Sequence, residues 1–293
     1  MSAPLDAELR RTTHGPITRL SFAPTAPPRD AQVSVYLVGD ALVDTGSTRV
    51  SRAVLAALRD RPPRRIVLTH QHEDHVGNVR LLLDALGPMP VLAPRELIDV
   101  IVATRRVPPY RAAFFGHPHP IERAELSPYD DGDELDCGGV TLTAQATPGH
   151  TPGHMALVVR EGGLARVMTG DLFTPRPLEV FFEAAIDDAV RSYRAVAALA
   201  PDVRLLPTHG RARDDGRAAL LRGADELEAL AARVHAEVAR SGDRDPVRVS
   251  ERLFGDDPMR AISGGEIGHA VFVRAVLEPV RRLPAIAVTP PAP

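Results

Sequence analysis

The sequence predicts an α/β protein with two β-rich halves, each carrying its own helices, followed by a helical C-terminal part. Three observations lead to this prediction. Strand and helix signals alternate over the first 210 residues, several of the strands end in a polar turn, and only helical spacing occurs beyond residue 213. With 293 residues, of which 44% are hydrophobic and 25% charged, the chain can form one large domain or two small ones.

The elements of the first half follow from apolar spacing and from the turn residues between them. An irregular lead-in holds one strand, two strands flank the Gly39-Asp40 turn, and Pro62-Pro63 closes the first helix. The residues 105–120, with four prolines, are expected to be irregular. The other elements expected here are strands at 17–22, 32–38, 41–44, 66–69 and 91–93 and helices at 50–60, 76–86 and 94–103.

The second half repeats the alternation and then changes character. Glycine turns separate a run of short strands, and a long helical tract follows the last of them. The expected elements are strands at 133–135, 140–146, 155–159, 165–168 and 204–207 and helices at 184–200, 214–240, 246–253 and 266–282. We therefore predict an α/β domain at 1–213, a helical extension at 214–284 and a flexible tail at 285–293.

Composition narrows the classes of partner. The formal net charge is −3, every basic residue is arginine, and no basic arm is present, which argues against nucleic-acid binding. No apolar run reaches the length of a membrane span, and the N-terminus shows no secretory signal. The single cysteine, Cys137, excludes an internal disulfide and is expected to be a small buried residue. We expect a cytoplasmic protein that acts on a small molecule and is not membrane-bound, and association into a homodimer stays open.

The densest group of candidate metal ligands is the segment HQHEDH at residues 70–75. In an extended segment, side chains two residues apart face the same side, so His70 and His72 can bind one ion. The chain then turns into the helix that starts near Val76, which directs Asp74 and His75 toward a second ion. Each ion needs further ligands from distant parts of the chain.

Three further candidate ligands each follow a predicted strand, namely His150, Asp171 and His209. We assign His70, His72 and His150 to one ion and Asp74, His75 and His209 to the other, with Asp171 bridging the two. Three protein ligands for each ion, beside shared oxygens, are typical of an open catalytic site rather than a closed structural one. Imidazole and carboxylate ligands suit Zn²⁺ best, and iron or manganese is also compatible with them.

In these segments the sequence resembles the metallo-β-lactamase-fold superfamily, and in particular generic members related to glyoxalase II. The resemblance rests on DTG at 44–46, HQHEDH at 70–75, TPGHTPGH at 147–154, TGD at 169–171 and THG at 208–210. It implies an αββα sandwich with a dimetal site at one edge, usually zinc and usually hydrolytic. It also implies that Asp44 lies near the metals without binding them. Residues 172–177 contain one arginine where glyoxalase II enzymes carry a basic glutathione-binding patch, and Thr174 stands where related lactonases have tyrosine.

The predicted activity is therefore hydrolysis of an ester-like bond by a hydroxide held between two metal ions. Thioesters, lactones and carboxylic esters come first as substrates, and phosphodiesters or phosphotriesters second. Asp74 is expected to bind metal and also to act in catalysis, by orienting the nucleophile or relaying its proton. Two alternatives stay open: an oxidoreductase with one iron, resembling persulfide dioxygenases, and a non-catalytic binding module.

Aromatic residues near these segments are candidates for a substrate pocket. Tyr110, Phe114, Phe115 and His117 lie in the proline-rich stretch, and Phe173 follows the candidate bridging aspartate. Such a mixture can hold a substrate with an apolar body and a polar tip. His154, four residues after His150, is expected to support a ligand or the packing rather than to bind metal.

Overall fold

The structure is a computed structural model that describes residues 5–26, 32–103, 107–174, 176–179 and 183–278. The chain divides into two compact units. The first unit comprises the described residues up to Ala144 together with Thr208–Gly210. The second unit comprises Gln145–Pro207 and the described residues from Arg211 onward, so the C-terminal helices share a unit with strands of the second half. The predicted division at residue 213 stays a prediction.

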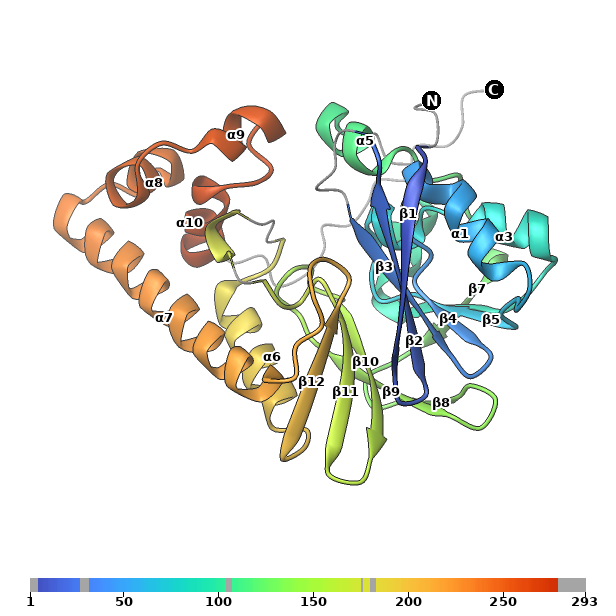
Figure 1. Cartoon of the computed structure of the whole chain (residues 1–293). Helices are drawn as coiled ribbons and strands as arrows, with labels where there is room; N and C mark the ends of the chain where they lie inside the picture. The colour runs from blue at the N-terminus through green and yellow to red at the C-terminus, as the bar shows by residue number, and fades with distance from the viewer. Residues whose placement is uncertain (1–4, 27–31, 104–106, 175, 180–182, 279–293) are drawn as a thin grey trace. The chain divides into compact units, whose positions relative to one another are not determined.

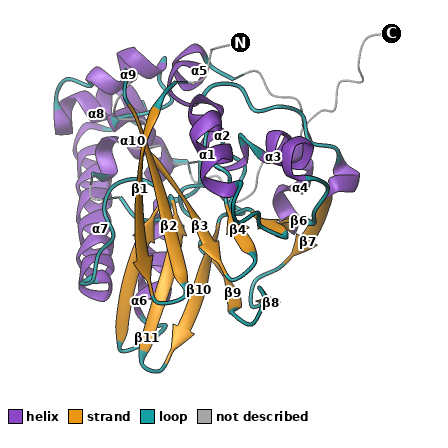
Figure 2. Ribbon diagram, turned by 45° about the vertical axis from the view of Figure 1, so that its right-hand side comes forward, coloured by secondary structure: helices purple, strands orange, loops and turns teal. Residues whose placement is uncertain are grey.

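The first unit is built on a seven-stranded sheet in which the strands follow one another in chain order (Figures 1 and 2). Neighbouring strands are antiparallel from β1 to β4 and parallel from β4 to β7. Its strands are β1 (Ala7–His14), β2 (Ile17–Pro24), β3 (Val33–Val38), β4 (Ala41–Val43), β5 (Arg65–Val67), β6 (Val91–Pro94) and β7 (Leu126–Tyr129).

Helices and one hairpin complete the first unit. The helices are α1 (Ser51–Leu58), α2 (Glu73–Val76), α3 (Val79–Leu86), α4 (Ile98–Val102) and α5 (Pro109–Phe115), and short 3₁₀ turns precede α1 and α4 at Thr48–Val50 and Arg95–Leu97. β8 (Glu134–Asp136) pairs antiparallel with β9 (Thr141–Ala146). Apolar side chains of β2 to β6 pack with those of α1 and α3 into one core, which includes Leu20, Val35, Leu42, Val54 and Leu82. Burial of this apolar stripe stabilises the helices, which are short.

In the second unit, β10 (Met155–Glu161) pairs antiparallel with β11 (Leu164–Gly170), which pairs parallel with β12 (Asp202–Pro207). The helices are α6 (Ile186–Ala197), α7 (Gly216–Ser241), α8 (Pro246–Phe254), α9 (Pro258–Ser263) and α10 (His269–Leu277). Tyr193 of α6 and Phe272 of α10 are among the largest side chains buried in its core. Figure 1 shows α6 and the long α7 beside each other, in agreement with their extensive contacts.

The structure corrects the sequence prediction at four elements. The lead-in contains an additional strand, β1, which pairs antiparallel with β2. Its side chains are mostly exposed, so the sequence carries no alternating apolar signal for it. β7 and α9 were not predicted either. The stretch expected to be irregular contains α5, because Pro109 occupies a first helical position, where its missing N–H costs nothing, and Gly116 ends the helix at φ 79°. Residues 105 and 106, the end of the predicted extension and the predicted tail lie outside the described residues.

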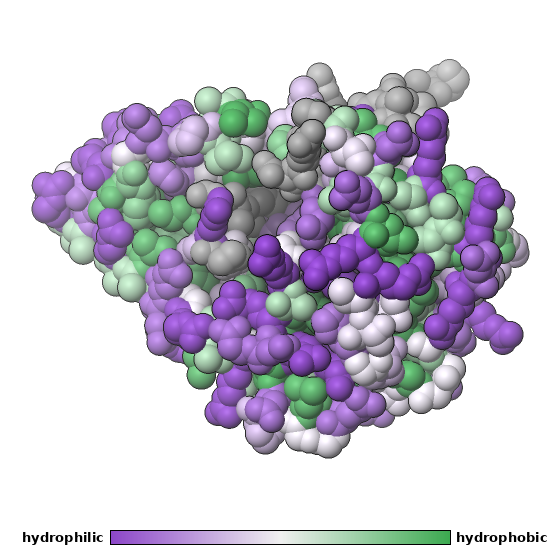
Figure 3. Space-filling model, viewed as in Figure 1, coloured by the Kyte–Doolittle hydropathy of each residue, from purple (hydrophilic) through white to green (hydrophobic). Residues whose placement is uncertain are grey.

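The exposed surface carries a mixture of residue types. On the face drawn in Figure 3, hydrophilic residues are spread over much of the surface, with hydrophobic ones between them. Among the described helices, none combines the length and the hydropathy needed to cross a bilayer.

Candidate metal centre

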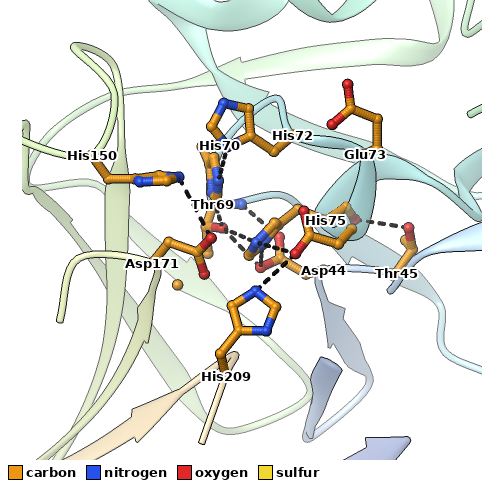
Figure 4. A network of polar contacts seen from close by, with 12 residues as sticks. Asp44, Thr45, Thr69, His70, His72, Glu73, His75, His150, Asp171 and His209 are labelled. Carbon is orange, nitrogen blue, oxygen red and sulfur yellow. Dashed lines mark hydrogen bonds and ion pairs between the residues drawn. The ribbon is translucent and has the colours of Figure 1, made fainter. Parts of the chain in front are cut away.

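The segment HQHEDH connects β5 to α2 in the first unit. His72 caps α2, since its carbonyl accepts the backbone N–H groups of His75 and Val76 at 2.9 and 3.0 Å. His70, His72, Asp74 and His75 are all buried, with at most 4% exposed. The His70 Nε2 and the His72 Nδ1 lie 3.1 Å apart, so these two rings direct nitrogen atoms at one point, as the extended segment predicts (Figure 4).

Asp44 and Thr69 determine which ring nitrogen each histidine offers. The Asp44 carboxylate accepts hydrogen bonds from the Thr69 backbone N–H and hydroxyl, both at 2.8 Å, and from the Nδ1 of His75 at 2.7 Å. Since the Thr69 hydroxyl donates to Asp44, it accepts from the Nδ1 of His70 at 3.1 Å. These bonds assign the protons to Nδ1, so Nε2 is the nitrogen through which His70 and His75 could bind a metal ion.

His209 is oriented in the same way. Its Nδ1 donates to the Gln32 carbonyl at 2.7 Å, and its Nε2 lies 2.8 Å from the Asp74 Oδ2. Arg19, which is 5% exposed, donates to the Gly210 carbonyl at 2.7 Å and so holds the chain directly after His209. The Nε2 of His75 lies 3.7 Å from the same Asp74 oxygen. Asp74, His75 and His209 thus direct one oxygen and two nitrogens at a common point.

The second unit contains the candidate ligands His150 and Asp171, whose Nε2 and Oδ2 lie 3.5 Å apart. His150 lies in the turn after β9, and its carbonyl accepts the Glu183 backbone N–H at 2.8 Å. Gly149 is required in this turn, because its φ is 152° and a Cβ there would lie 2.7 Å from the Cα of Ala189 in α6. Asp171 directly follows β11, as its place after a predicted strand suggested.

His154 supports this pair, as the sequence suggested, and does not offer a free nitrogen. Its Nε2 accepts the Asp171 backbone N–H at 3.2 Å, which places its proton on Nδ1, 2.8 Å from the Thr147 hydroxyl oxygen. Both ring nitrogens therefore serve hydrogen bonds, and His154 fixes the backbone that carries Asp171.

The donor set fits divalent metal ions. Within the first unit, the ligand atoms of His70 and His72, and separately those of Asp74, His75 and His209, lie within 4.8 Å of one another. Within the second unit the same limit holds for His150 and Asp171. Buried imidazole nitrogens whose other nitrogen donates to a carboxylate or carbonyl are typical of protein ligands to zinc. The full assignment of seven ligands to two ions stays a prediction.

The predicted substrate residues of the first unit lie on or next to α5. The Phe115 ring centre lies 6.3 Å from that of His209, and the Phe114 ring lies 6.1 Å from that of Phe115. Tyr110 is half-buried in the first turn of the helix, and His117 is exposed beyond its end. Of these predicted substrate residues, Phe115 is thus the one whose ring lies beside a candidate metal ligand, His209.

Phe173, in the second unit, packs against that unit's core. Its ring lies 5.8 Å from the ring of Tyr193, and the Arg213 guanidinium lies 5.8 Å from the Phe173 ring centre. Core packing accounts for these contacts, and its predicted contact with substrate stays a prediction.

Sequence reasoning missed a buried ion pair between Glu73 and Arg111. Both the Nε and the Nη2 of Arg111 donate to the Glu73 Oε2, at 2.9 and 2.5 Å. Burial raises the pKa of Glu73 above its ordinary value, although the charge and hydrogen bonds of Arg111 act in the opposite direction. The available signal was a charged residue inside a ligand motif, with its partner 38 residues away.

A further bond supports the start of the ligand loop. The Tyr129 hydroxyl donates to the Leu68 carbonyl at 2.7 Å, directly before Thr69. Burial, with a smaller effect from the Asp44 charge, raises the pKa of Tyr129 well above its ordinary value, so the hydroxyl remains a donor at neutral pH.

The chain is similar in sequence to known hydrolases over part of its length. A hydroxyacylglutathione hydrolase from Cereibacter sphaeroides is 30% identical over 181 residues, which are 59% of this chain and 61% of that relative. One from Pseudomonas putida is 33% identical over 131 residues, 45% of this chain and 41% of the relative. The alignments thus span less than two thirds of either relative.

Solved structures share the fold over nearly the whole chain. A metallo-beta-lactamase family protein from Thermus thermophilus superposes with a TM-score of 0.65 at 23% identity, covering 90% of this chain and 93% of that chain. A beta-lactamase domain protein from Burkholderia ambifaria gives 0.69 at 18% identity, covering 94% and 90%.

The family model described as metallo-beta-lactamase superfamily matches residues 28–209, more than half of the chain, and so includes every candidate ligand. The shared fold and this match confirm the predicted α/β sandwich with a helical C-terminal part. The chain belongs to the metallo-beta-lactamase superfamily.

Proposed function

We propose that the chain is a hydrolase that binds two divalent metal ions, most favourably Zn²⁺. One ion is bound by His70, His72 and His150 and the other by Asp74, His75 and His209, with Asp171 shared between them. The observation that carries the proposal is the orientation of His70, His75 and His209, each of which donates through Nδ1 and directs Nε2 toward another candidate ligand. A histidine that merely packs in a core has no need of an Nε2 held beside other ligand atoms.

The proposed ligands come from distant parts of the chain. His150 and Asp171 are two of the seven ligands and come from the second unit, whereas the other five come from the first. The superfamily match spans all seven of these residues.

When bound, two such ions supply a nucleophile from water at neutral pH and polarise a substrate oxygen. The contribution of the chain is geometric and electrostatic. Asp44 holds His75, Gln32 holds His209, and His154 holds the backbone of Asp171. Asp74, whose side chain is 4% exposed and lies beside those of His209 and His75, would accept a proton from water and orient it.

The substrate class that we propose is a small molecule with an ester-like bond: a thioester, lactone or carboxylic ester first, and a phosphodiester or phosphotriester second. The names of the relatives, hydroxyacylglutathione hydrolases, support hydrolysis of an acyl group. Phe115 beside His209 would offer an apolar surface to the body of such a substrate. Arg176 is the one basic residue between 172 and 177, which argues against strong recognition of glutathione carboxylates there.

The test combines metal analysis of the purified protein with a panel of thioester, lactone, carboxylic ester and phosphoester substrates. We expect about two ions per chain. Hydrolysis of at least one acyl substrate should be lost on chelation and restored by Zn²⁺. One iron per chain with oxygen consumption would instead indicate an oxidoreductase. Two bound ions with no hydrolysis across the panel would indicate a binding module.

A further inference from the structure

α5 is attached to the metal-ligand loop by one buried ion pair. Arg111, in the middle of the helix, makes two hydrogen bonds to a single oxygen of Glu73. The two side chains are 13% and 9% exposed. Glu73 lies between His72 and Asp74, so this pair joins α5 directly to the segment that carries four candidate ligands.

Among the described residues, no side chain of α5 belongs to the apolar core of the first unit. The helix is seven residues long, which is too short for it to be stable by itself. Of its side chains, that of Ala112 is buried. At its C-terminal end, the Thr48 hydroxyl donates to the Phe115 carbonyl at 3.2 Å. A pocket opens beside Glu73 and is lined in part by Gln71, His117 and Ile121. The ion pair thus attaches the helix to the ligand loop by a polar contact rather than through the apolar core.

The end of α5 also carries the side chain nearest to a candidate ligand. Phe115 follows Arg111 by four residues, one turn of helix, and its ring faces that of His209 at 6.3 Å. A shift of Arg111 would move Phe115 with it, because both belong to the same short helix.

We propose that Arg111 is a positioning residue that couples α5 to the metal-ligand loop through Glu73, so that Phe115 is held against His209 as a wall of the substrate pocket. The part of this proposal that concerns substrate rests on the proposed function, whereas the coupling of α5 to the loop does not. Because coupling between two sites is reciprocal, metal binding that orders the loop also orders α5. Zn²⁺ should then slow backbone exchange in a helix that contributes no ligand.

The experiment measures hydrogen exchange by mass spectrometry over residues 107–118, with and without Zn²⁺, in the full-length protein. The variants are Arg111→Met, which removes the charge and keeps the apolar stem, and Arg111→Lys, which keeps the charge but loses the two-donor geometry. Arg95→Met is the matched control, because Arg95 makes an exposed ion pair with Asp130 in the same unit. We expect Zn²⁺ to slow exchange in α5 about tenfold in the wild type and in Arg95→Met, and hardly at all in Arg111→Met.

For any substrate that the wild type hydrolyses, Arg111→Met should raise KM about tenfold and leave kcat within about threefold, with partial rescue in Arg111→Lys. The proposal is overturned if exchange in α5 responds to Zn²⁺ equally in Arg111→Met and Arg95→Met. It is also overturned if Arg111→Met loses metal while its α5 exchange matches the wild type. If no substrate is hydrolysed, the proposed function fails, and the exchange data still decide whether the coupling exists.

Discussion

Asp44 combines complete burial with a left-handed backbone at φ 55°, the one such conformation outside glycine among the described residues. Aspartate and asparagine tolerate this conformation better than other residues because their short polar side chains bond locally. The strained backbone directs the carboxylate at Thr69 and His75. Asp44 thus orients His75, one of the candidate metal ligands.

We predict that Asp44→Asn weakens metal binding by about 10- to 100-fold while the fold is retained. Asparagine keeps the backbone conformation, but its amide cannot match the charge that holds the Nδ1 proton of His75. Competition with a chromogenic chelator measures the affinity. Asp40→Asn is the control, since Asp40 pairs with Arg65 and lies outside the ligand set. Equal affinities in the two variants would contradict the role given to Asp44.

Cys137 is a fully buried thiol, and burial raises its pKa to about 11, with smaller effects from Arg65 and the nearby aspartates. The raised pKa keeps the thiol neutral and unreactive at ordinary pH. We predict that iodoacetamide alkylates the native protein slowly at about pH 8 and faster as the pH approaches the thiol pKa of about 11. Protein unfolded in urea should react at the lower pH at the rate of a free cysteine, which mass spectrometry can follow. Rapid labelling of the folded protein at that pH would show that the thiol is accessible.

At the scale of the element, strand ends and short helices present the functional side chains. β5 leads into His70, β11 into Asp171 and β12 into His209. Rigid strands fix the position of the backbone, and the irregular residues that follow are free to turn ligands toward one point. α5 differs, because it is placed by its polar contacts more than by a core.

We predict that Phe115→Ala changes kcat/KM unequally across ester-like substrates while the metal content stays unchanged. Loss of an aromatic wall should cost roughly 1–3 kcal/mol for the substrates that contact it. Phe114→Ala is the matched control on the same helix, since Phe115 is the residue whose ring lies beside His209. If both variants keep the wild-type ranking of substrates, α5 does not contact the substrate. Phe173 then becomes the next candidate.

At the scale of the whole molecule, the proposed metal ligands are spread along the chain from His70 to His209. A ligand that binds only the native state stabilises it by RT ln(1 + [L]/Kd), about 4 kcal/mol at a thousandfold excess over Kd. Since the proposed assignment uses all seven ligands, loss of any one of them should remove most of this stabilisation.

We therefore predict that Zn²⁺ raises the thermal midpoint of the wild type by about 10 °C. Asp171→Ala, in the second unit, and His75→Ala, in the first, should each abolish most of this rise, and hydrolysis with it. Calorimetry measures the shift, with the exposed Asp225→Asn as a control. A full Zn²⁺-dependent rise in Asp171→Ala would contradict the assignment of Asp171 as a shared metal ligand.

Local signals explain how much of the fold the sequence could predict. The alternation of strands and helices, the helical C-terminal part and the strand that precedes each candidate ligand follow from apolar spacing and turn residues a few positions apart. The segment at 70–75 likewise carries its spacing in six consecutive residues. These features depend on the near neighbours of each residue and are therefore visible in the chain.

The tertiary structure decided what depends on distant partners. β1 forms because its backbone pairs with β2 along its whole length. α5 is attached by the hydrogen bond from Arg111 to Glu73, which lies 38 residues earlier in the chain. The same is true of the ring nitrogens: Asp44, Thr69 and Gln32 select Nε2 of His75, His70 and His209 by contacts that span up to 177 residues. The sequence by itself determined the family, the types of candidate ligand and their order, because these are written in local motifs. Only folding set the direction of each lone pair, because a hydrogen bond requires both partners to be in place.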